Sequence, residues 1–449
     1  MEPGSVHVPL GAVLPLWTVL PFGLLLGAIA ILPMAAPRWW DANGHKGIVA
    51  LLVAAPLAAY LLFAHGAEGG LALGESLQDY LSFIALLGSL FVISGGIHVG
   101  GSLAGTPIAN TAFLGTGAVL ANMIGTTGAS MILVRPLLRA NAERRRTAHV
   151  FVFFIFVVSN CGGLLTPLGD PPLFLGFLKG VPFLWPLSLW KQWLMVNGLL
   201  LVAFHIIDEV LLEREERERP EGLLDVVLEH RPIRVTGLHN LVFLGGVVAV
   251  MVARGAGWGT GGEPWPFGIQ EGAMALLAAA AYVTTGAQLR IANRFRFGPI
   301  LEVAVLFLGI FVTMTAPLLI LNARGAALGL ETSWHYFWAT GALSSFLDNA
   351  PTYLTFAATA AGAVGVSVES GSYLADVVES SRGAALLAAI SCGAVMMGAN
   401  TYIGNGPNFM VRAIVEENGV RMPSFFGYMA WSAAVLLPIF LLVTLIFFR

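Results

Sequence analysis

The chain has 449 residues, of which 57% are hydrophobic and only 11% are charged. An ordinary soluble domain carries about 25% charged residues, so this composition and the mean hydropathy of +0.80 exclude one. The formal net charge of −3 identifies no partner, and we expect none among nucleic acids.

Apolar runs of roughly 20 residues recur along the chain, and this length spans a lipid bilayer. The first run follows MEPGSVHVPLG, which lacks the basic region of a signal peptide, so we expect a retained helix. The chain would then be all-α and would cross the membrane many times. We predict membrane helices near residues 12–34, 47–65, 78–98, 193–212, 237–254, 268–288, 298–322 and 424–448.

Four other apolar segments carry residues that disturb a membrane helix. Residues 105–137 and 334–362 are long for one span and have Gly, Pro, Asn and Thr near their middles, so we predict re-entrant helical hairpins. Residues 149–180 and 383–414 contain GGLLTPLGDPP and GANTYIGNGP, so we predict broken helices. Glycine and proline free backbone groups there, and such backbone is tolerated only inside protein or beside water. Paired broken helices are typical of secondary transporters and of their binding sites.

The broken helices and the hairpin tips each look like one motif written twice. A shift of 235 residues aligns the first broken helix with the second, and a shift of 223 residues aligns the two hairpin tips. We therefore predict an internal repeat. The paired positions are Gly163 with Gly398, Thr166 with Thr401, Gly169 with Gly404, Asp170 with Asn405, Pro172 with Pro407, Asn122 with Ser345, Gly125 with Asp348, and Thr126 with Asn349.

Basic residues indicate how the repeats are oriented. With the N-terminus outside, 17 of the 23 basic residues fall on the cytoplasmic side, as the positive-inside rule requires. This count needs both hairpins to be re-entrant, and the hairpins then enter from opposite sides. We therefore predict two inverted repeats in a bacterial-type cytoplasmic membrane. The predicted segments are an N-terminal transmembrane helix at 1–45, a first repeat at 46–212, a cytoplasmic linker at 213–236 and an inverted second repeat at 237–449.

Two carboxylates at predicted membrane depth give the sharpest functional signal. A charged side chain there costs ~3 kcal/mol or more and usually marks an ion or proton path. Hard cations bind carboxylate, amide, hydroxyl and backbone oxygen atoms, and a carboxylate that exchanges a proton for sodium would couple the two ions. We therefore predict Asp170 and Asp348 as sodium ligands. The predicted cation- or proton-binding residues are Asn122, Thr126, Thr127, Thr166 and Asp170 in one cluster, and Ser345, Asp348, Asn349, Thr352, Asn400, Thr401 and Asn405 in the other.

A plainer interpretation of these residues remains open, because Asn, Ser, Thr and Asp side chains can also cap broken helices and bind only backbone. No Gly-rich lysine motif for phosphate occurs, and Cys and His do not cluster at metal-ligand spacing. We expect no enzyme and no cofactor, with sodium as the transported or coupling ion. Cys161 and Cys392 are expected to be buried free thiols.

Three segments carry a family resemblance that covers almost the whole chain, namely GGLLTPLGDPPLF at 162–174, SSFLDNAPTYLTF at 344–356 and GANTYIGNGPNFM at 398–410. They resemble the ion transporter superfamily, which includes NhaD-type sodium/proton antiporters, arsenite exporters, and citrate and dicarboxylate carriers. The first two segments look most like the antiporter and pump-like branches. The hairpin tips depart from the Ser-Asn-Thr triplet of the dicarboxylate branch, yet some relatives of this type are described as citrate transporters. The resemblance implies a scaffold domain of outer helices, a moving transport domain with the hairpins and broken helices, and a homodimer.

The sequence leaves three functions open. The favoured one is a sodium/proton antiporter that works by alternating access, with both ions competing for Asp170 and Asp348. The alternative is a sodium-coupled transporter of citrate or a dicarboxylate, whose anion pocket would need helix N-termini because no buried basic residue is evident. The third is a channel or a membrane-embedded interaction protein, which the duplicated broken helices disfavour.

Overall fold

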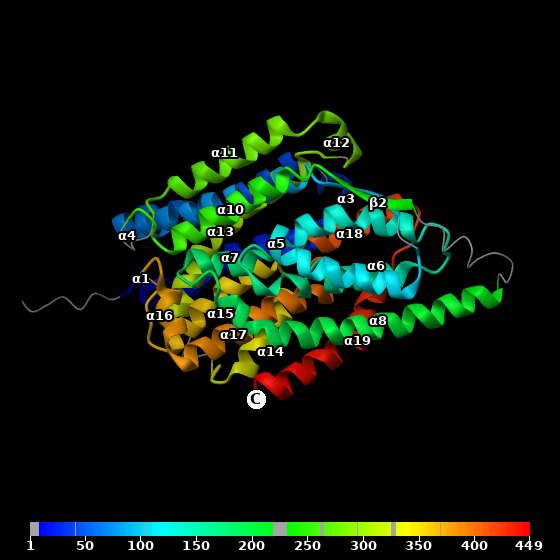
Figure 1. Ribbon diagram of the computed structural model, residues 1–449. Helices are drawn as coiled ribbons and strands as arrows, with labels where there is room; N and C mark the ends of the chain where they lie inside the picture. The colour runs from blue at the N-terminus through cyan, green and yellow to red at the C-terminus, as the bar shows by residue number, and fades with distance from the viewer. Residues whose placement is uncertain are drawn as a thin grey trace, which may run out of the picture.

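Helices make up nearly all of the chain in the computed structural model (Figure 1), which describes residues 9–40, 42–102, 104–218, 231–260, 265–293, 295–324, 329–368 and 370–449. Eight of the described helical segments are long and apolar enough to cross a membrane, which confirms the prediction of an all-α polytopic membrane protein. The elements are α1 (Leu10–Val13), η1 (Leu16–Val19), α2 (Leu20–Ala35), α3 (Pro37–Trp40), α4 (Asn43–Ser94), β1 (His98–Ser102), α5 (Pro107–Ala140), α6 (Ala148–Val157), η2 (Cys161–Leu165), α7 (Pro171–Leu178), η3 (Trp185–Leu189), α8 (Trp190–Glu218), β2 (Arg231–Thr236), α10 (Asn240–Gly255), α11 (Ile269–Thr284), α12 (Ala287–Ala292), α13 (Gly298–Arg324), α14 (Ser333–Ser344), α15 (Asn349–Ala363), α16 (Tyr373–Glu379), α17 (Ser381–Met397), η5 (Gly398–Asn400), α18 (Gly406–Glu417) and α19 (Phe425–Phe447).

Helix α4 contains two spans. Its 52 residues would reach roughly 78 Å as one straight helix, more than twice the hydrocarbon thickness of a bilayer. The helix breaks at Gly66, where φ is 51° and ψ is −121°, a conformation that glycine adopts readily. A Cβ atom on Gly69 would lie 2.0 Å from the Leu61 carbonyl oxygen, so the chain turns back tightly. The two spans correspond to the helices predicted near 47–65 and 78–98, and the second starts directly after the break.

The two segments that the sequence predicts as re-entrant hairpins each form a pair of helical arms. Helix α5 breaks at Gly125, where φ is 77° and ψ is 154°. Asn110 and Asn141, at the ends of its two arms, exchange two side-chain hydrogen bonds of 2.9 Å, so both arms return to the same end. The second pair is α14 and α15, which are joined by residues 345–348.

Each predicted broken helix consists of two helices separated by an irregular turn. The first runs from α6 through η2 to α7, and the second runs from α17 through η5 to α18. Every residue from Val150 to Val158 is fully buried, because α6 is apolar on all sides and lies inside the bundle. Proline stands in the first turn of both α7 and α18, where its missing N–H costs no helical hydrogen bond.

A short antiparallel ribbon of β1 and β2 was not predicted. It pairs His98 with Thr236 and joins the end of α4 to the segment before α10. His98, the last residue of the helix predicted near 78–98, therefore begins a strand instead. The predicted linker at 213–236 starts inside α8, which continues to Glu218, and it ends in β2. Its middle part, residues 219–230, lies outside the described residues.

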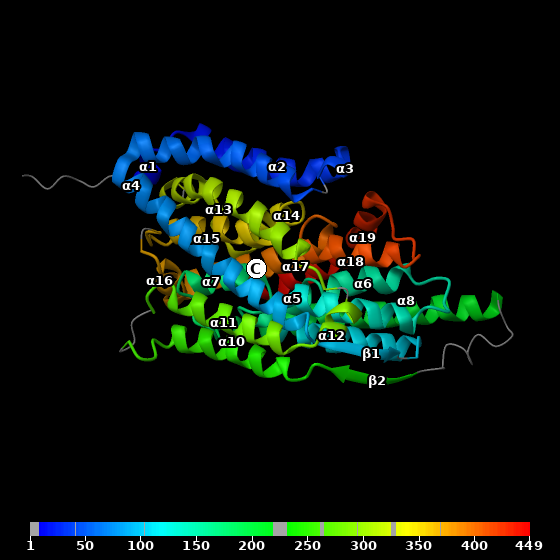
Figure 2. The same ribbon diagram turned by 90° about the horizontal axis from the view of Figure 1, so that it is seen from above.

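The two hairpins open at opposite ends of the bundle. Strand β1 leads into α5 and α15 leads into α16, and both views place β2, the partner of β1, at one end and α16 at the other (Figures 1 and 2). The two halves of the chain have matching orders of elements. The first half has α2, the two spans of α4, α5, α6–α7 and α8, and the second half has α10, α11, α13, α14–α15, α17–α18 and α19. An inverted repeat requires this order. It would pair α2 with α10, although the prediction kept 1–45 outside the repeat. The predicted domain boundaries and membrane orientation stay predictions.

Candidate ion-binding site

In the first half, two polar side chains hold the broken helix to the hairpin tip. The Thr166 hydroxyl donates to the Asn122 carbonyl oxygen at 2.5 Å and accepts the Gly169 amide at 3.1 Å. The Asn122 side chain donates to the Gly162 carbonyl oxygen at 2.7 Å and accepts the Leu165 amide at 2.8 Å. These bonds satisfy backbone groups that the irregular turn leaves without helical partners. Both side chains therefore have the capping role that was the plainer interpretation.

The second half repeats this arrangement at the aligned positions. The Thr401 hydroxyl donates to the Ser345 carbonyl oxygen at 2.5 Å and accepts the Gly404 amide at 3.1 Å. The Ser345 hydroxyl also accepts a hydrogen bond from Asn400 Nδ2 at 2.9 Å. The same hydroxyl-to-carbonyl and amide-to-hydroxyl bonds thus brace both hairpin tips against their broken helices.

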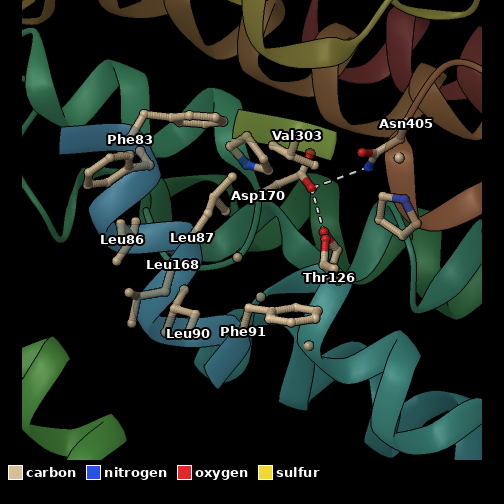
Figure 3. Close-up of a pocket in the computed structure, with 18 of the residues that line it drawn as sticks. Phe83, Leu86, Leu87, Leu90, Phe91, Thr126, Leu168, Asp170, Val303 and Asn405 are labelled. Carbon is tan, nitrogen blue, oxygen red and sulfur yellow. Dashed lines mark hydrogen bonds between the residues drawn. The ribbon is translucent and has the colours of Figure 1, made fainter. Parts of the chain in front are cut away.

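Asp170 lies where the two halves meet, and it is only 1% exposed. Its Oδ1 accepts hydrogen bonds from the Thr126 hydroxyl at 2.7 Å and from Asn405 Nδ2 at 3.4 Å, drawn as dashed lines in Figure 3. Its Oδ2 accepts a hydrogen bond from Asn349 Nδ2. Thr126 belongs to the first hairpin, whereas Asn349 begins α15 of the second hairpin and Asn405 directly precedes α18. The structure therefore brings members of both predicted clusters to one carboxylate.

Asp170 and Asp348 occupy similar helix positions but use their carboxylates differently. Both stand at an N-cap, Asp170 before α7 and Asp348 before α15. Asp348 Oδ1 accepts the Ala350 amide at 3.1 Å, so this carboxylate caps its helix. The Thr352 hydroxyl donates to the Asp348 carbonyl oxygen at 3.0 Å. Asp170 makes no capping hydrogen bond to α7, so helix capping does not account for its burial.

A cavity of about 90 Å³ borders on both carboxylates, which is room for several water molecules. One wall consists of apolar side chains from α4, such as Phe83 and Leu86 in Figure 3. The half-buried Thr127 belongs to the opposite wall, with the hairpin tips and the broken helices. Among the described residues that line the cavity, Asp170 and Asp348 are the charged ones, and none is Lys, Arg or His. This charge distribution favours a cation over an anion.

Two amide oxygen atoms in the second half, one at the hairpin tip and one in the broken helix, have no donor. Asn349 Oδ1 and Asn400 Oδ1 are buried and lack a hydrogen-bond partner among the described residues. An unsatisfied buried acceptor is unfavourable, and a hard cation would satisfy it. Elsewhere in the described chain, no group of three or more His, Cys, Asp and Glu side chains could hold a metal ion. Cys161 and Cys392 are free and buried, as predicted.

Sequence reasoning missed two buried asparagines that join the broken helices. Asn160 Nδ2 donates to Asn408 Oδ1 at 2.7 Å, and Asn405 Nδ2 donates to Asn160 Oδ1 at 3.2 Å. The 235-residue shift pairs them with Val395 and Leu173, so a search for repeated polar positions passes over both. The signal that could have found them is simpler: each is an amide inside an apolar run at membrane depth.

The twelve predicted site residues fall into three groups. The first group is hydrogen-bonded around one carboxylate, the second lines the cavity beside it, and the third bonds to backbone or within the group. Which of them bind an ion stays a prediction. The first group is Asp170, Thr126, Asn349 and Asn405. The second group is Asp348 and Thr127. The third group is Asn122, Thr166, Ser345, Thr352, Asn400 and Thr401.

A comparison with known proteins gives the family. No curated protein matches the chain. One family profile matches residues 11–448, which include both hairpins, both broken helices and the cavity, and it indicates a transporter rather than an enzyme. The antiporter branch that the sequence resembles is not named by this match. The chain belongs to the family described as "Putative citrate transport".

Proposed function

We propose that the protein is a secondary transporter that exchanges sodium for protons by alternating access, with Asp170 as the carboxylate for which both ions compete. The observation that carries this proposal is the bonding of Asp170, which is buried, does not cap its helix and accepts hydrogen bonds from both halves. Protonation removes the negative charge that attracts a hard cation, so proton and sodium compete. Asp348, which lines the same cavity, is the second sodium ligand in this proposal.

The side chains around Asp170 can serve both ions. Thr126, Asn349 and Asn405 each carry an oxygen acceptor beside the donor hydrogen that now points to the carboxylate. A half-turn of the Asn349 amide presents its oxygen atom to the carboxylate side, where it would help to coordinate a sodium ion bound to Asp170. The Asn405 amide would keep its orientation, because its Nδ2 atom also donates to the Ser159 carbonyl oxygen and to Asn160 Oδ1. Asn349 Oδ1 is already without a donor among the described residues. The exchange therefore needs rotation of side chains and no rearrangement of the braced backbone.

The position of the cavity supports alternating access as the mechanism. Its lining comes from α4 and α13 on one side, and from the first hairpin, the segment before α7, Asp348 and α18 on the other. In the proposal, α4 and α13 belong to a static scaffold, and the hairpins and broken helices form the moving transport domain. A displacement of the second group past the first exposes Asp170 to either side in turn. A homodimer in a bacterial-type cytoplasmic membrane, with the N-terminus outside, completes the proposal.

A sodium-coupled carrier of citrate or another carboxylate is the second candidate, because the family description names citrate. The anion would have to bind to helix N-termini, since no basic residue lines the cavity among the described residues. Proline reduces that capacity, because Pro171 and Pro172 in the first turn of α7 and Pro407 in the first turn of α18 have no N–H to donate. Two carboxylates beside the site would also repel a polyanion. The geometry therefore favours the cation exchanger.

Proteoliposomes that contain the full chain and a trapped pH indicator test the two functions directly. An imposed sodium gradient should move protons without citrate, and labelled citrate should not accumulate. The apparent sodium affinity should be highest at alkaline pH and should fall as pH drops, because protonation of the carboxylate removes a ligand charge.

Sodium-driven uptake of labelled citrate, with proton movement only when citrate is present, would instead establish the carrier. Leakage of sodium that continues at the same rate without a counter-ion would argue for a channel. A potassium gradient of the same size is the matched control for membrane potential.

A further inference from the structure

A second cavity lies far from the carboxylates, at the end of the bundle where the first hairpin opens. Its volume is about 790 Å³, and its wall joins the α5–α6 connection to the α18–α19 connection. Five arginines line it, together with His149 at its base. The arginines are Arg139, Arg144, Arg145, Arg146 and Arg421.

Arg144 belongs to the lining of this cavity, and its side chain is held in place. Its side chain is fully buried, and its Nη2 atom lies 2.5 Å from Asp208 Oδ1. Its Nη1 donates to the Gly105 carbonyl oxygen at 3.0 Å. His149 Nε2 lies 2.8 Å from the same Asp208 oxygen. The Nε atom of Arg144 is buried without a partner among the described residues, so Arg144 contributes positive charge beneath the cavity surface rather than an exposed donor.

Carboxylates match only some of the arginines at the mouth. Glu215, the nearest buried carboxylate on α8, accepts the backbone amides of Arg145 and Arg146 at 2.7 Å and 3.4 Å. Arg146 pairs with the exposed Glu218 at 2.7 Å. Within the described chain, neither Arg145 nor Arg421 has a carboxylate at ion-pair distance, and the described lining contains no Asp or Glu. The cavity therefore has a surplus of positive charge.

The start of α6 adds backbone donors to the same wall. Thr147 and Ala148 line the cavity, and Thr147 is the N-cap of this ten-residue helix without capping it through its side chain. The first N–H groups of a helix and its dipole favour an anion. Arginine forks combined with helix N–H groups match a tetrahedral phosphate, which offers several oxygen atoms in a compact group.

We propose that this cavity binds a phosphate group, either as free inorganic phosphate or as the head group of an anionic phospholipid. Arg145 and Arg421 would close on the ligand from the two connections, and the buried guanidinium of Arg144 would add positive charge behind them. The ligand would tie the first hairpin to the end of the second broken helix. The proposal is independent of which ion the carboxylate site carries.

Purified full-length protein in detergent tests the site with two ligands. Inorganic phosphate is titrated at constant ionic strength against sodium chloride, and binding is followed by calorimetry and by the thermal unfolding midpoint. Short-chain phosphatidylglycerol is titrated in parallel, with phosphatidylcholine as the zwitterionic control. Saturable binding of phosphate identifies a soluble ligand, and binding of phosphatidylglycerol alone identifies a lipid head group.

The double variant Arg145→Gln/Arg421→Gln should weaken binding about a hundredfold, on the order of tenfold for each lost charge-assisted contact. The Arg217→Gln variant is the control, because this side chain is 81% exposed on α8 and does not line the cavity. Without ligand, both variants should unfold at the wild-type temperature. The proposal is overturned if neither ligand binds the wild type, if the double variant binds as tightly as the control, or if citrate binds more tightly than both phosphate ligands.

Discussion

The two half-sites share a backbone frame but not a charge pattern. In both, a threonine in the irregular turn of the broken helix donates a hydrogen bond to a hairpin-tip carbonyl oxygen at 2.5 Å. The first half carries its carboxylate on the broken helix, as Asp170, and has Gly125 at the tip. The second half carries its carboxylate at the tip, as Asp348, and has Asn405 on the broken helix. In the proposed function, the two halves thus form one composite site centred on Asp170, with Asp348 beside it, rather than two equal sites.

The strongest test of this asymmetry compares two neutral variants. Asp170→Asn should lower sodium-driven proton movement by about 100-fold or more, or ~3 kcal/mol. It removes the carboxylate to which side chains of both halves donate hydrogen bonds. Asp348→Asn should cost only about tenfold, or ~1.4 kcal/mol, because the amide oxygen can still cap α15 at the Ala350 amide. Both rates are measured in proteoliposomes with matched protein content.

A carboxylate moved between the repeat-related positions sharpens the result. Asn405 Nδ2 lies 3.4 Å from Asp170 Oδ1. The double variant Asp170→Asn/Asn405→Asp therefore moves the carboxylate to a position next to its original one. The double variant should recover part of the exchange that Asp170→Asn loses. Equal activity of Asp170→Asn and Asp348→Asn would show that the half-sites are equivalent, which would refute the composite site.

Because both halves share the same backbone frame, substitution of a closely packed glycine should lower the free energy of unfolding equally in each half. A Cβ on Gly169 would lie 2.1 Å from the Gly163 carbonyl oxygen, and a Cβ on Gly404 would lie 2.5 Å from the Gly398 carbonyl oxygen. Gly169→Ala and Gly404→Ala should each lower the free energy of unfolding by ~3 kcal/mol, since backbone must move. Gly406→Ala, with nothing within 4 Å of its Cβ, is the control. Chemical unfolding in detergent micelles measures all three, and unchanged stability of either variant would break the parallel.

The asparagine link between the broken helices should matter less than the glycine contacts. Asn160→Ala leaves Asn408 Oδ1 and the Asn405 side chain without their 2.7 Å and 3.2 Å partners. The loss of stability should be about 1–3 kcal/mol, as for a buried polar group left unsatisfied. Sodium affinity should fall as well, because Asn405 also donates to Asp170. Asn418→Ala removes the hydrogen bond from this exposed side chain to the Ile414 carbonyl oxygen at 2.7 Å, and it should leave the sodium affinity unchanged. A stable variant with unaltered sodium affinity would contradict this role.

The membrane class, most of the long apolar helices, the paired helical arms and the broken helices could be predicted from the sequence, because each follows from local composition and from glycine and proline in apolar runs. The helices α10 and α11, in two of the predicted spans, are shorter than the helices that are long enough to cross a membrane. The aligned pairs Thr166–Thr401 and Asn122–Ser345 recur in the structure with the same bonds. The grouping around the site could not be predicted. A repeat alignment keeps each half's residues together, whereas packing of the two halves places Asn349 on Asp170, 179 positions away.

The β1–β2 ribbon and the arginine cavity escaped prediction for a related reason. The ribbon pairs His98 with Thr236 across most of the first half, and such non-local pairing leaves no short pattern in the sequence. From the sequence alone, the basic residues of the α5–α6 connection indicate only the orientation in the membrane. That Arg144 is buried against Asp208 depends on where α8 packs, which sequence periodicity alone does not give.

The smallest expected effect concerns the end of the bundle opposite the ribbon. Lys179, after α7, lies 2.5 Å from Asp79 on α4, and their side chains are 14% and 19% exposed. This pair connects the proposed transport domain to the proposed scaffold, so it should favour the conformation in which both touch. Asp79→Asn should shift the ratio of the two access states by on the order of fivefold, or about 1 kcal/mol, as expected for a partly exposed ion pair. The ratio is measured by labelling Thr127→Cys, in the cavity wall, with an impermeant thiol reagent from each side of the membrane.

The charge-swapped variant Asp79→Lys/Lys179→Asp should restore the wild-type ratio. Glu213→Gln, which breaks an exposed pair with Arg217 at 3.7 Å, should leave the ratio unchanged. If all three variants show the wild-type labelling ratio, the ion pair between Lys179 and Asp79 does not influence the ratio of the two access states.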